Sequence, residues 1–147
     1  MAFEPPIPPI QAHICVKGGL EAISFYEAAL GAACTFRQMA KDGQRVLHAN
    51  LAINGSEIML HDEFPEYGRD ILSPTSRSGA SVTLNLNLAR AGDVDRWVAR
   101  AAEAGASVIM PAADMFWGAR HARIRDPFGH VWAFNAPIAP EVGENIG

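Results

Sequence analysis

The sequence predicts an α+β fold of two tandem βαβββ modules, and two observations lead to this prediction. Two segments carry apolar residues at helical spacing, and each segment ends near a glycine, Gly31 or Gly105. These glycines lie 74 positions apart, and so do Gly55 and Gly129, each of which stands in a tight turn before a strand-like run. Because one offset relates both pairs, the chain repeats a unit of one strand, one helix and three strands.

In the first module we expect a helix at residues 20–32, where Ile23, Tyr26 and Leu30 recur at helical spacing. The segment KDGQ at residues 41–44 is typical of a hairpin turn. Runs of apolar and β-branched residues on either side of these features predict strands at residues 11–16, 34–39, 45–53 and 57–61.

The second module follows the same order. We expect its helix at residues 93–106, since Asp93 is a good N-cap and Val94, Trp97 and Val98 begin an apolar stripe. The residues of DPFG at positions 126–129 suit a tight turn, in which proline fixes φ and glycine is free to take a positive φ. Strands are predicted at residues 81–88, 107–110, 119–125 and 131–135.

These elements divide the chain into five parts. A Pro-rich start resembles an extended arm, and a polar segment rich in Gly, Ser and Pro joins the halves. We therefore expect an N-terminal arm at 1–9, module 1 at 10–62, a linker at 63–79, module 2 at 80–137 and a C-terminal tail at 138–147.

Composition narrows the function classes. The chain has 147 residues, of which 49% are hydrophobic and 19% charged, and this is enough to bury one ordinary core. The formal net charge of −4 and the lack of a basic cluster argue against a nucleic-acid partner. We find no signal peptide and no apolar run of membrane-spanning length, so we expect a cytoplasmic protein without a membrane partner. Cys15 and Cys34 form no CxxC motif and are expected to be reduced, packed thiols.

Side-chain alternation along the strands separates a face covered by helices from an opposite face. The residues expected under the helices are Ile14, Val16, Leu47, Ala49, Leu51, Ile53, Ile58, Leu60, Val82, Leu84, Leu86, Leu88, Ile124, Trp132 and Phe134. The opposite face is then formed by Gln11, His13, Cys15, His48, Asn50, Glu57, Met59, His61, Ser81, Thr83, Asn85, Asn87, His121, Arg123, Arg125, Ala133 and Asn135. Two interpretations are compatible with it: a half-buried face whose neutral polar groups bond one another, and a concave ligand pocket with a few placed polar groups.

A loop before the strand at 119–125 carries two aromatic residues, Phe116 and Trp117. They form either a stacking surface for a planar ligand or a plug between the modules. Arg120 or Arg123 could add a positive charge beside them. His130 follows the turn at 126–129 and is expected to stabilise it by hydrogen bonding rather than to act in catalysis.

The segments FYEAALGA and WGARHARIRDPFGHVWAF, together with the repeat, resemble the vicinal oxygen chelate superfamily, which includes glyoxalase I, bleomycin-resistance proteins and extradiol dioxygenases. The ending FWG…DPFGH.W is similar to the PhnB-like branch, and the resemblance covers residues 10–137. It implies two βαβββ modules whose curved mixed sheets enclose a cleft, with the helices on the outer faces. It also implies a homodimer, whose clefts commonly combine modules from both subunits.

The resemblance places metal ligands on the first and last strand of each module, which here means Gln11, Met59, Asn85 and Ala133, with Thr83 as an alternative to Asn85. A thioether, a methyl group and carboxamides are poor ligands for divalent ions, so no metal and no other cofactor is expected. His13 and His61 are weaker candidates: on parallel neighbouring strands they could face each other and hold Zn²⁺ or Ni²⁺, with water or with a histidine from residues 45–53.

Three functions remain compatible with the sequence, which leaves undecided whether the protein is an enzyme. The first is sequestration of an aromatic or amphipathic small molecule, as in antibiotic resistance, in a polar cleft of a dimer. The second is a metal-assisted or histidine-based lyase, isomerase or transferase, with His13 and His61 as the candidate catalytic residues. The third is a dimeric scaffold whose cleft has decayed. The predicted ligand-binding residues are Gln11, His13, His48, Asn50, Met59, His61, Thr83, Asn85, Phe116, Trp117 and Arg123.

Overall fold

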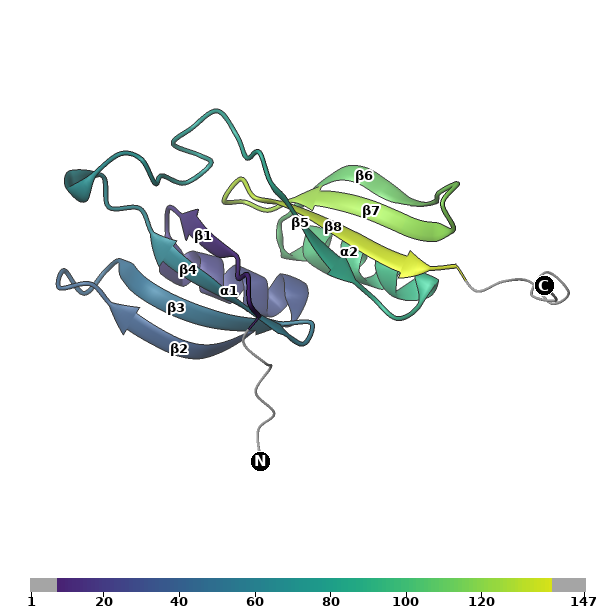
Figure 1. The fold of residues 1–147 in the computed structure, drawn as a ribbon, viewed down its shortest axis with the longest axis horizontal. Coiled ribbons are helices and arrows are strands. Elements are labelled where there is room, and N and C mark those ends of the chain that lie inside the picture. The colour runs from purple at the N-terminus through teal and green to yellow at the C-terminus, as the bar shows by residue number, and fades with distance from the viewer. Residues whose placement is uncertain (1–7, 139–147) are drawn as a thin grey trace, which may run out of the picture.

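The computed structural model describes residues 8–138 and contains two modules with the same order of elements (Figure 1). The first module consists of β1 (His13–Val16), α1 (Gly19–Leu30), β2 (Ala33–Met39), β3 (Val46–Ile53) and β4 (Ser56–Asp62). The second consists of β5 (Thr83–Asn87), α2 (Ala91–Ala104), β6 (Ser107–Asp114), β7 (Ala119–Arg125) and β8 (Val131–Pro137). One 3₁₀ turn, η1 (Pro65–Tyr67), lies in the connection between them. Of the predicted arm and tail, residues 1–7 and 139–147 lie outside the described residues.

Both modules form a four-stranded mixed sheet of the same topology. The strand order is β1-β4-β3-β2 in the first sheet and β5-β8-β7-β6 in the second. The first and last strands of each module, β1 with β4 and β5 with β8, pair in parallel, and the remaining neighbours are antiparallel. This arrangement confirms the predicted α+β fold of tandem βαβββ modules.

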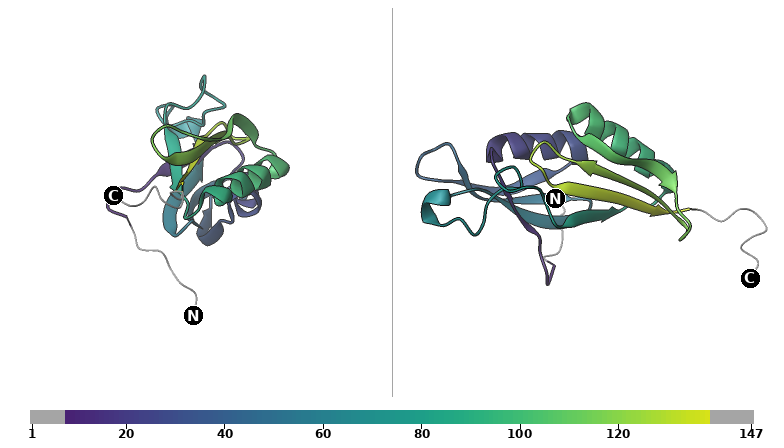
Figure 2. Two further views of the ribbon diagram at one scale, coloured as in Figure 1. Left: turned by 90° about the vertical axis from the view of Figure 1, so that its right-hand side faces the viewer. Right: turned by 90° about the horizontal axis from the view of Figure 1, so that it is seen from above.

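The two helices lie on the same side of the two sheets, as both further views show (Figure 2). The strands below them bury Ile14, Val16, Ala49, Leu51, Ile53 and Leu60 in the first module and Ala122, Ile124, Trp132 and Phe134 in the second. These residues belong to one continuous hydrophobic core. Each sheet therefore has one face covered by a helix and an opposite face that no helix of residues 8–138 covers. We call the latter the open faces of the two sheets.

The helix α1 begins where the carboxylate of Asp62 meets its first turn. Asp62 is 4% exposed and accepts hydrogen bonds from the backbone N–H groups of Gly18, Gly19 and Val46, at 2.7–3.0 Å. A Cβ atom on Gly19 would lie 2.5 Å from Asp62 Oδ2, so only glycine allows this approach. The end of β4 thus fixes the start of α1 beside β3.

The turn at residues 126–129 joins the modules through a buried carboxylate. Asp126 is 3% exposed and accepts hydrogen bonds from the Tyr26 hydroxyl, Trp132 Nε1, and the backbone N–H groups of Phe128 and His130. Burial and the nearby carboxylate raise the pKa of Tyr26 well above its usual value, which keeps this donor protonated. Because Tyr26 belongs to α1 and Asp126 to the second module, this bond crosses the boundary between them.

His130 adds a second bond across the same boundary. Its Nε2 donates to the backbone oxygen of Cys15 in β1 at 2.8 Å, and its backbone N–H closes the turn on Asp126. The structure thus gives His130 a hydrogen-bonding part in the turn, as predicted, and in addition ties it to the other module.

Two residues predicted to lie under the helices are exposed instead, and each has a local cause. Leu47 is 47% exposed, because Gln38 pairs with His48 while Met39 pairs with Val46, so that Leu47 is an extra residue in a β-bulge. Val46 takes the buried position in its place. Val82 is 63% exposed, since it precedes β5, which begins at Thr83.

The open faces are less solvated than their polar side chains suggest. Cys15, His121 and Ala133 were expected there, and all three are buried. Burial raises the pKa of the Cys15 thiol to about 11, which makes it an unreactive group at neutral pH. Cys15 and Cys34 are both free. Between residues 8 and 138, neither helix has the length and apolar character that crossing a membrane requires.

Removing the Asp126 carboxylate should destabilise the fold strongly. We expect Asp126→Ala to lower the free energy of unfolding by about 3 kcal/mol, because four buried donors lose their acceptor. Tyr26→Phe removes one of these donors and should cost about 1–2 kcal/mol. Urea unfolding measures both effects, with the exposed carboxylate of Glu103 (Glu103→Gln) as the control. Losses below about 0.5 kcal/mol in both variants would contradict this role.

Candidate functional site

Three histidines come together on the open face of the first sheet. His13 on β1 lies with its ring centroid 4.8 Å from that of His61 on β4 and 5.5 Å from that of His48 on β3, and both contacts are edge-to-face. We call His13, His48 and His61 the imidazole cluster. The expected approach of His13 to His61 on parallel neighbouring strands is confirmed, although the strand register pairs His13 with Met59 and Cys15 with His61. The two rings are diagonal neighbours and still touch.

Hydrogen bonds fix the tautomers of two of these rings. His61 Nδ1 lies 2.6 Å from the backbone oxygen of Asp62, which can only accept, so Nδ1 carries the proton and Nε2 is a free acceptor. His48 Nε2 lies 2.7 Å from Asn50 Oδ1, which assigns the proton to Nε2 and leaves Nδ1 as an acceptor. The cluster therefore presents unprotonated ring nitrogens.

His13 sits between the other two rings and stays neutral at physiological pH. Partial burial lowers its pKa, and the positive charges that His61 and His48 would carry lower it further. A group of this kind can accept a proton from a ligand, but it does not offer a fixed positive charge to an anion.

Three further predicted residues adjoin the cluster. Met59 lies on β4 opposite both His13 and Asn50, so its side chain adjoins the imidazoles. Gln11 lies at the edge, where its Nε2 donates to the backbone oxygen and to the side chain of Glu57.

The open face of the second sheet carries a chain of hydrogen bonds that crosses three strands. Arg123 Nε donates to His121 Nε2 at 3.2 Å, and His121 Nδ1 donates to Asn135 Oδ1 at 2.7 Å. Asn135 Nδ2 donates to Asn85 Oδ1, and Asn85 Nδ2 donates to Asn87 Oδ1 at 3.0 Å. The direction of donation is the same in all four bonds, from Arg123 to Asn87. We call these five residues the amide relay.

Three members of the relay, Asn87, His121 and Asn135, are absent from the predicted binding residues, and the last two touch each other directly. Strand alternation does place all three on the open face, but the contact of His121 with Asn135 depends on the register of β7 with β8, which pairs them. A search for polar residues at cross-strand positions of the same face could have found them.

The aromatic loop lies beside the relay. The Trp117 ring centroid is 5.9 Å from that of His121 and 5.1 Å from that of Phe116. Phe116 is 97% exposed and Trp117 is 51% exposed, so Phe116 does not plug the gap between the modules. Arg120 is engaged by Asp95 and Asp114, whereas Arg123 is bonded to His121 and so is the cation next to the aromatic loop. A cavity of about 300 Å³ is lined by Trp117, Asn87 and Asn135 among others.

The predicted binding residues thus form two groups on two sheets. The first sheet brings together His13, His48, Asn50, Met59 and His61, with Gln11 at its edge. The second sheet holds Thr83, Asn85 and Arg123, with Trp117 packed against it. They line different cavities: His61 lines one of about 270 Å³, Trp117 lines one of about 300 Å³, and Asn85 lines a third, also of about 300 Å³, to which both modules contribute residues.

The register also decides which positions of the two modules correspond. Asn85 pairs with Ala133, and His13 pairs with Met59. Because Met59 and Ala133 are related by the 74-residue offset, the counterpart of Asn85 is His13, and Thr83 is the counterpart of Gln11. The alternative alignment with Thr83 is therefore the one that the strands adopt.

The positions that the fold family uses for a metal do not fit one here. Met59 offers a thioether, Ala133 has no donor atom, Gln11 is bonded to Glu57, and Thr83, the counterpart of Gln11, offers only a neutral hydroxyl. Neutral donors of this kind leave the charge of a divalent ion uncompensated. Among residues 8–138, no three His, Cys, Asp or Glu side chains are grouped suitably for a metal ion.

Two βαβββ modules with a shared core and polar open faces define a class of duplicated, two-sheet proteins. A family model described as the Glyoxalase/Bleomycin resistance protein/Dioxygenase superfamily matches residues 9–134. The chain belongs to this family, which confirms the superfamily that the sequence motifs predicted.

Both sequence relatives and solved structures are similar to this chain. The protein Mb0911c of Mycobacterium bovis is 38% identical over 132 residues, which are 89% of this chain and 84% of the relative. Among solved structures, the At5g48480 gene product of Arabidopsis thaliana is 25% identical with a TM-score of 0.67, covering 88% of this chain and 98% of that one. The PhnB protein of Bacillus cereus has a TM-score of 0.65 at 18% identity, covering 90% and 100% respectively. Its fold agrees with the predicted PhnB-like resemblance.

The lowered pKa of His13 makes stability depend on pH. An unfolded chain has a histidine pKa of about 6.5, so between this value and the lower folded value the unfolded state binds more protons. We therefore expect the free energy of unfolding to fall as the pH drops from about 7 through the folded pKa of His13. His13→Gln should show a smaller fall when urea unfolding is compared at about pH 7.5 and about pH 5.5. An equal fall in both proteins would argue against this assignment.

Proposed function

We propose that the protein binds an aromatic or amphipathic small molecule against the open faces of its sheets, in a cleft completed by a second copy of the chain. The amide relay is the observation that carries this proposal. It holds neutral hydrogen-bonding groups in one arrangement on a face that no helix covers, beside an exposed tryptophan. Such fixed polar groups next to an aromatic surface are typical of small-molecule sites.

Apolar exposure supports pairing with a second copy. Phe36 is 49% exposed, Leu47 47%, Val108 43% and Met110 36%. These residues lie on the two outer antiparallel pairs, β2 with β3 and β6 with β7. Large apolar side chains in such numbers usually mark a surface that another molecule covers. We propose a homodimer in which residues 10–62 of one subunit and 80–137 of the other face each other, with 63–79 as the connection.

The chemistry of the two faces favours binding over turnover. The second sheet offers amide groups, an indole and one guanidinium, and the first sheet offers neutral imidazoles, a carboxamide and a thioether. Arg123 is the fixed charge among these groups. Since the family description includes bleomycin resistance proteins, we propose sequestration of a planar compound, as in antibiotic resistance, as the biological use.

Tryptophan fluorescence tests the proposal directly. We expect planar aromatic compounds to quench it saturably with Kd below about 1 mM, since stacking on Trp117 changes the surroundings of an exposed indole. Trp117→Phe should remove most of the quenching. Trp97→Phe should retain it, because Trp97 lies on α2 and packs against Phe134 on the helix side of the sheet. Quenching that survives in the first variant and vanishes in the second would refute a site at Trp117.

A second candidate function has a specific observation in its favour. His13 is held neutral near physiological pH, and His61 Nε2 is an unprotonated acceptor on the same face. Either nitrogen could act as a general base for a lyase, isomerase or transferase without the participation of a metal. This alternative requires a ligand that is positioned over the first sheet.

Histidine variants separate the two functions. If the protein sequesters its ligand, His13→Gln and His61→Gln should change Kd by less than about tenfold and no product should form with either protein. If a histidine is the base, the same variants should lower kcat by about 10²-fold or more while binding persists. Mass spectrometry of each bound compound after incubation with the wild-type protein measures turnover. Conversion by the wild-type protein alone would favour the enzyme.

A further inference from the structure

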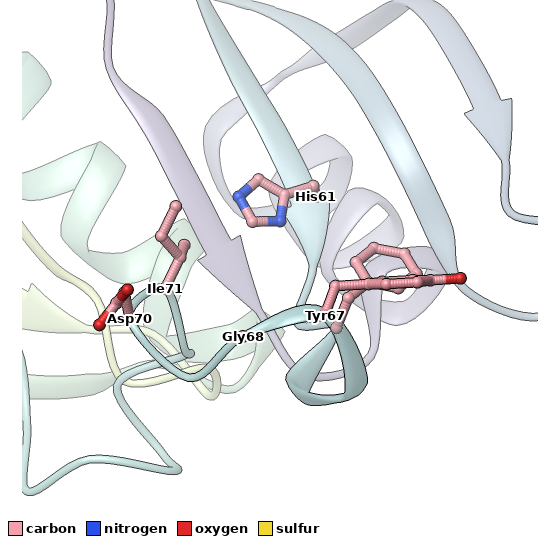
Figure 3. Close-up of a pocket in the computed structure, with 6 residues that line it drawn as sticks. His61, Tyr67, Gly68, Asp70 and Ile71 are labelled. Atoms are coloured by element: carbon pink, nitrogen blue, oxygen red, sulfur yellow. The ribbon is translucent and has the colours of Figure 1, made fainter.

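A cavity of about 270 Å³ lies between β4 and the connection that follows it (Figure 3). Its lining consists of His61, Phe64, Tyr67, Gly68, Asp70 and Ile71. One wall is thus His61 of the imidazole cluster, and the other is the segment that joins the modules. The volume is slightly below that of most drug-sized sites and suits one or two fused rings.

The connection is held in place at both ends of this segment. The Arg45 guanidinium lies 4.4 Å from the Phe64 ring centroid and forms an ion pair with Glu66. At the other end, the backbone N–H of Ser73 donates to Glu63 Oε2 at 3.0 Å, and Ser73 is fully buried. The wall of the cavity is therefore positioned by contacts outside the cavity.

Apolar side chains of the wall remain uncovered. Tyr67 is 86% exposed and Ile71 is 64% exposed, although each is large enough to stabilise the fold by burial. Figure 3 shows the Tyr67 hydroxyl directed away from His61, so the part of the cavity next to His61 receives no donor from it. These two side chains offer an aromatic and an aliphatic surface to a ring.

The polar groups of the lining are acceptors. In the neutral ring of His61, Nε2 is the acceptor, because Nδ1 donates to the backbone oxygen of Asp62. Asp70 contributes a carboxylate, and the six lining residues include no lysine or arginine. A ligand that satisfies this cavity has to bring hydrogen-bond donors, and one with a positive charge is favoured by the carboxylate.

We propose that this cavity binds the aromatic ring of a cationic amine, with the ring against Tyr67 and Ile71 and the ammonium group toward Asp70 and His61. The inference rests on the proposed small-molecule function and adds the charge class of a ligand at this cavity, which is separate from that of Trp117. An anionic compound is disfavoured by Asp70, and a neutral one gains no attraction from this exposed carboxylate.

Three probes that share one ring system test the charge preference. They are 1-naphthalenemethylamine, 1-naphthalenemethanol and the carboxylate of 1-naphthaleneacetic acid, which are cationic, neutral and anionic at about pH 7.5. By isothermal titration calorimetry we expect the amine to bind about fivefold to tenfold more tightly than the alcohol, and the acetate most weakly. Asp70→Asn should remove the advantage of the amine and leave the alcohol unchanged. Glu103→Gln, which changes the net charge equally at an exposed position on α2, should have no effect.

A second variant tests the position of the ring. Tyr67→Ala should weaken the amine and the alcohol by the same factor, of about threefold or more, because the lost contact is apolar. Equal binding of all three probes to the wild-type protein, with no change in Asp70→Asn, overturns the charge preference and leaves the proposed function standing. Unchanged binding in Tyr67→Ala overturns the cavity as the site. The proposed function itself fails only if the fluorescence test at Trp117 also fails.

Discussion

The carboxylate of Asp126 is the point at which the two modules become one domain. It accepts hydrogen bonds from a tyrosine of α1, from a tryptophan of β8 and from the backbone of its own turn. A buried charge without these donors would be costly, so the carboxylate and its four partners depend on one another. Because the bond from the Tyr26 hydroxyl holds α1 against the second module, it also sets how the two open faces lie relative to each other.

The faces differ in what they offer. The first sheet presents imidazoles, each with a ring nitrogen that can accept a hydrogen bond. The second presents carboxamides in a chain of hydrogen bonds that starts at the guanidinium of Arg123. This difference arises on strands of identical order in the two sheets. The duplicated fold thus provides two chemically distinct surfaces from one repeated plan.

Much of this arrangement could be predicted from the sequence, because glycine spacing and strand alternation depend on local chemistry. The order of elements and the open-face position of His13, His61, Asn85 and Trp117 follow from such patterns. The bulge at Leu47 could not be predicted, since it depends on how β2 pairs with β3. The same holds for the offset of His13 from His61, because it depends on how β1 pairs with β4. Tautomers and the amide relay require side-chain geometry.

The direction of the amide relay has a consequence for selectivity. Arg123 can only donate, so each following group must accept on one side and donate on the other, and Asn87 is left with its own amide hydrogens unspent. Arg123 on β7 thereby determines that Asn87, two strands away on β5, offers hydrogen-bond donors to a ligand. A ligand with a hydrogen-bond acceptor, such as a carbonyl compound, finds complementary hydrogens at this end. The hydrogen bonds that Asn87 can offer to a ligand thus depend on a residue that is not in contact with it.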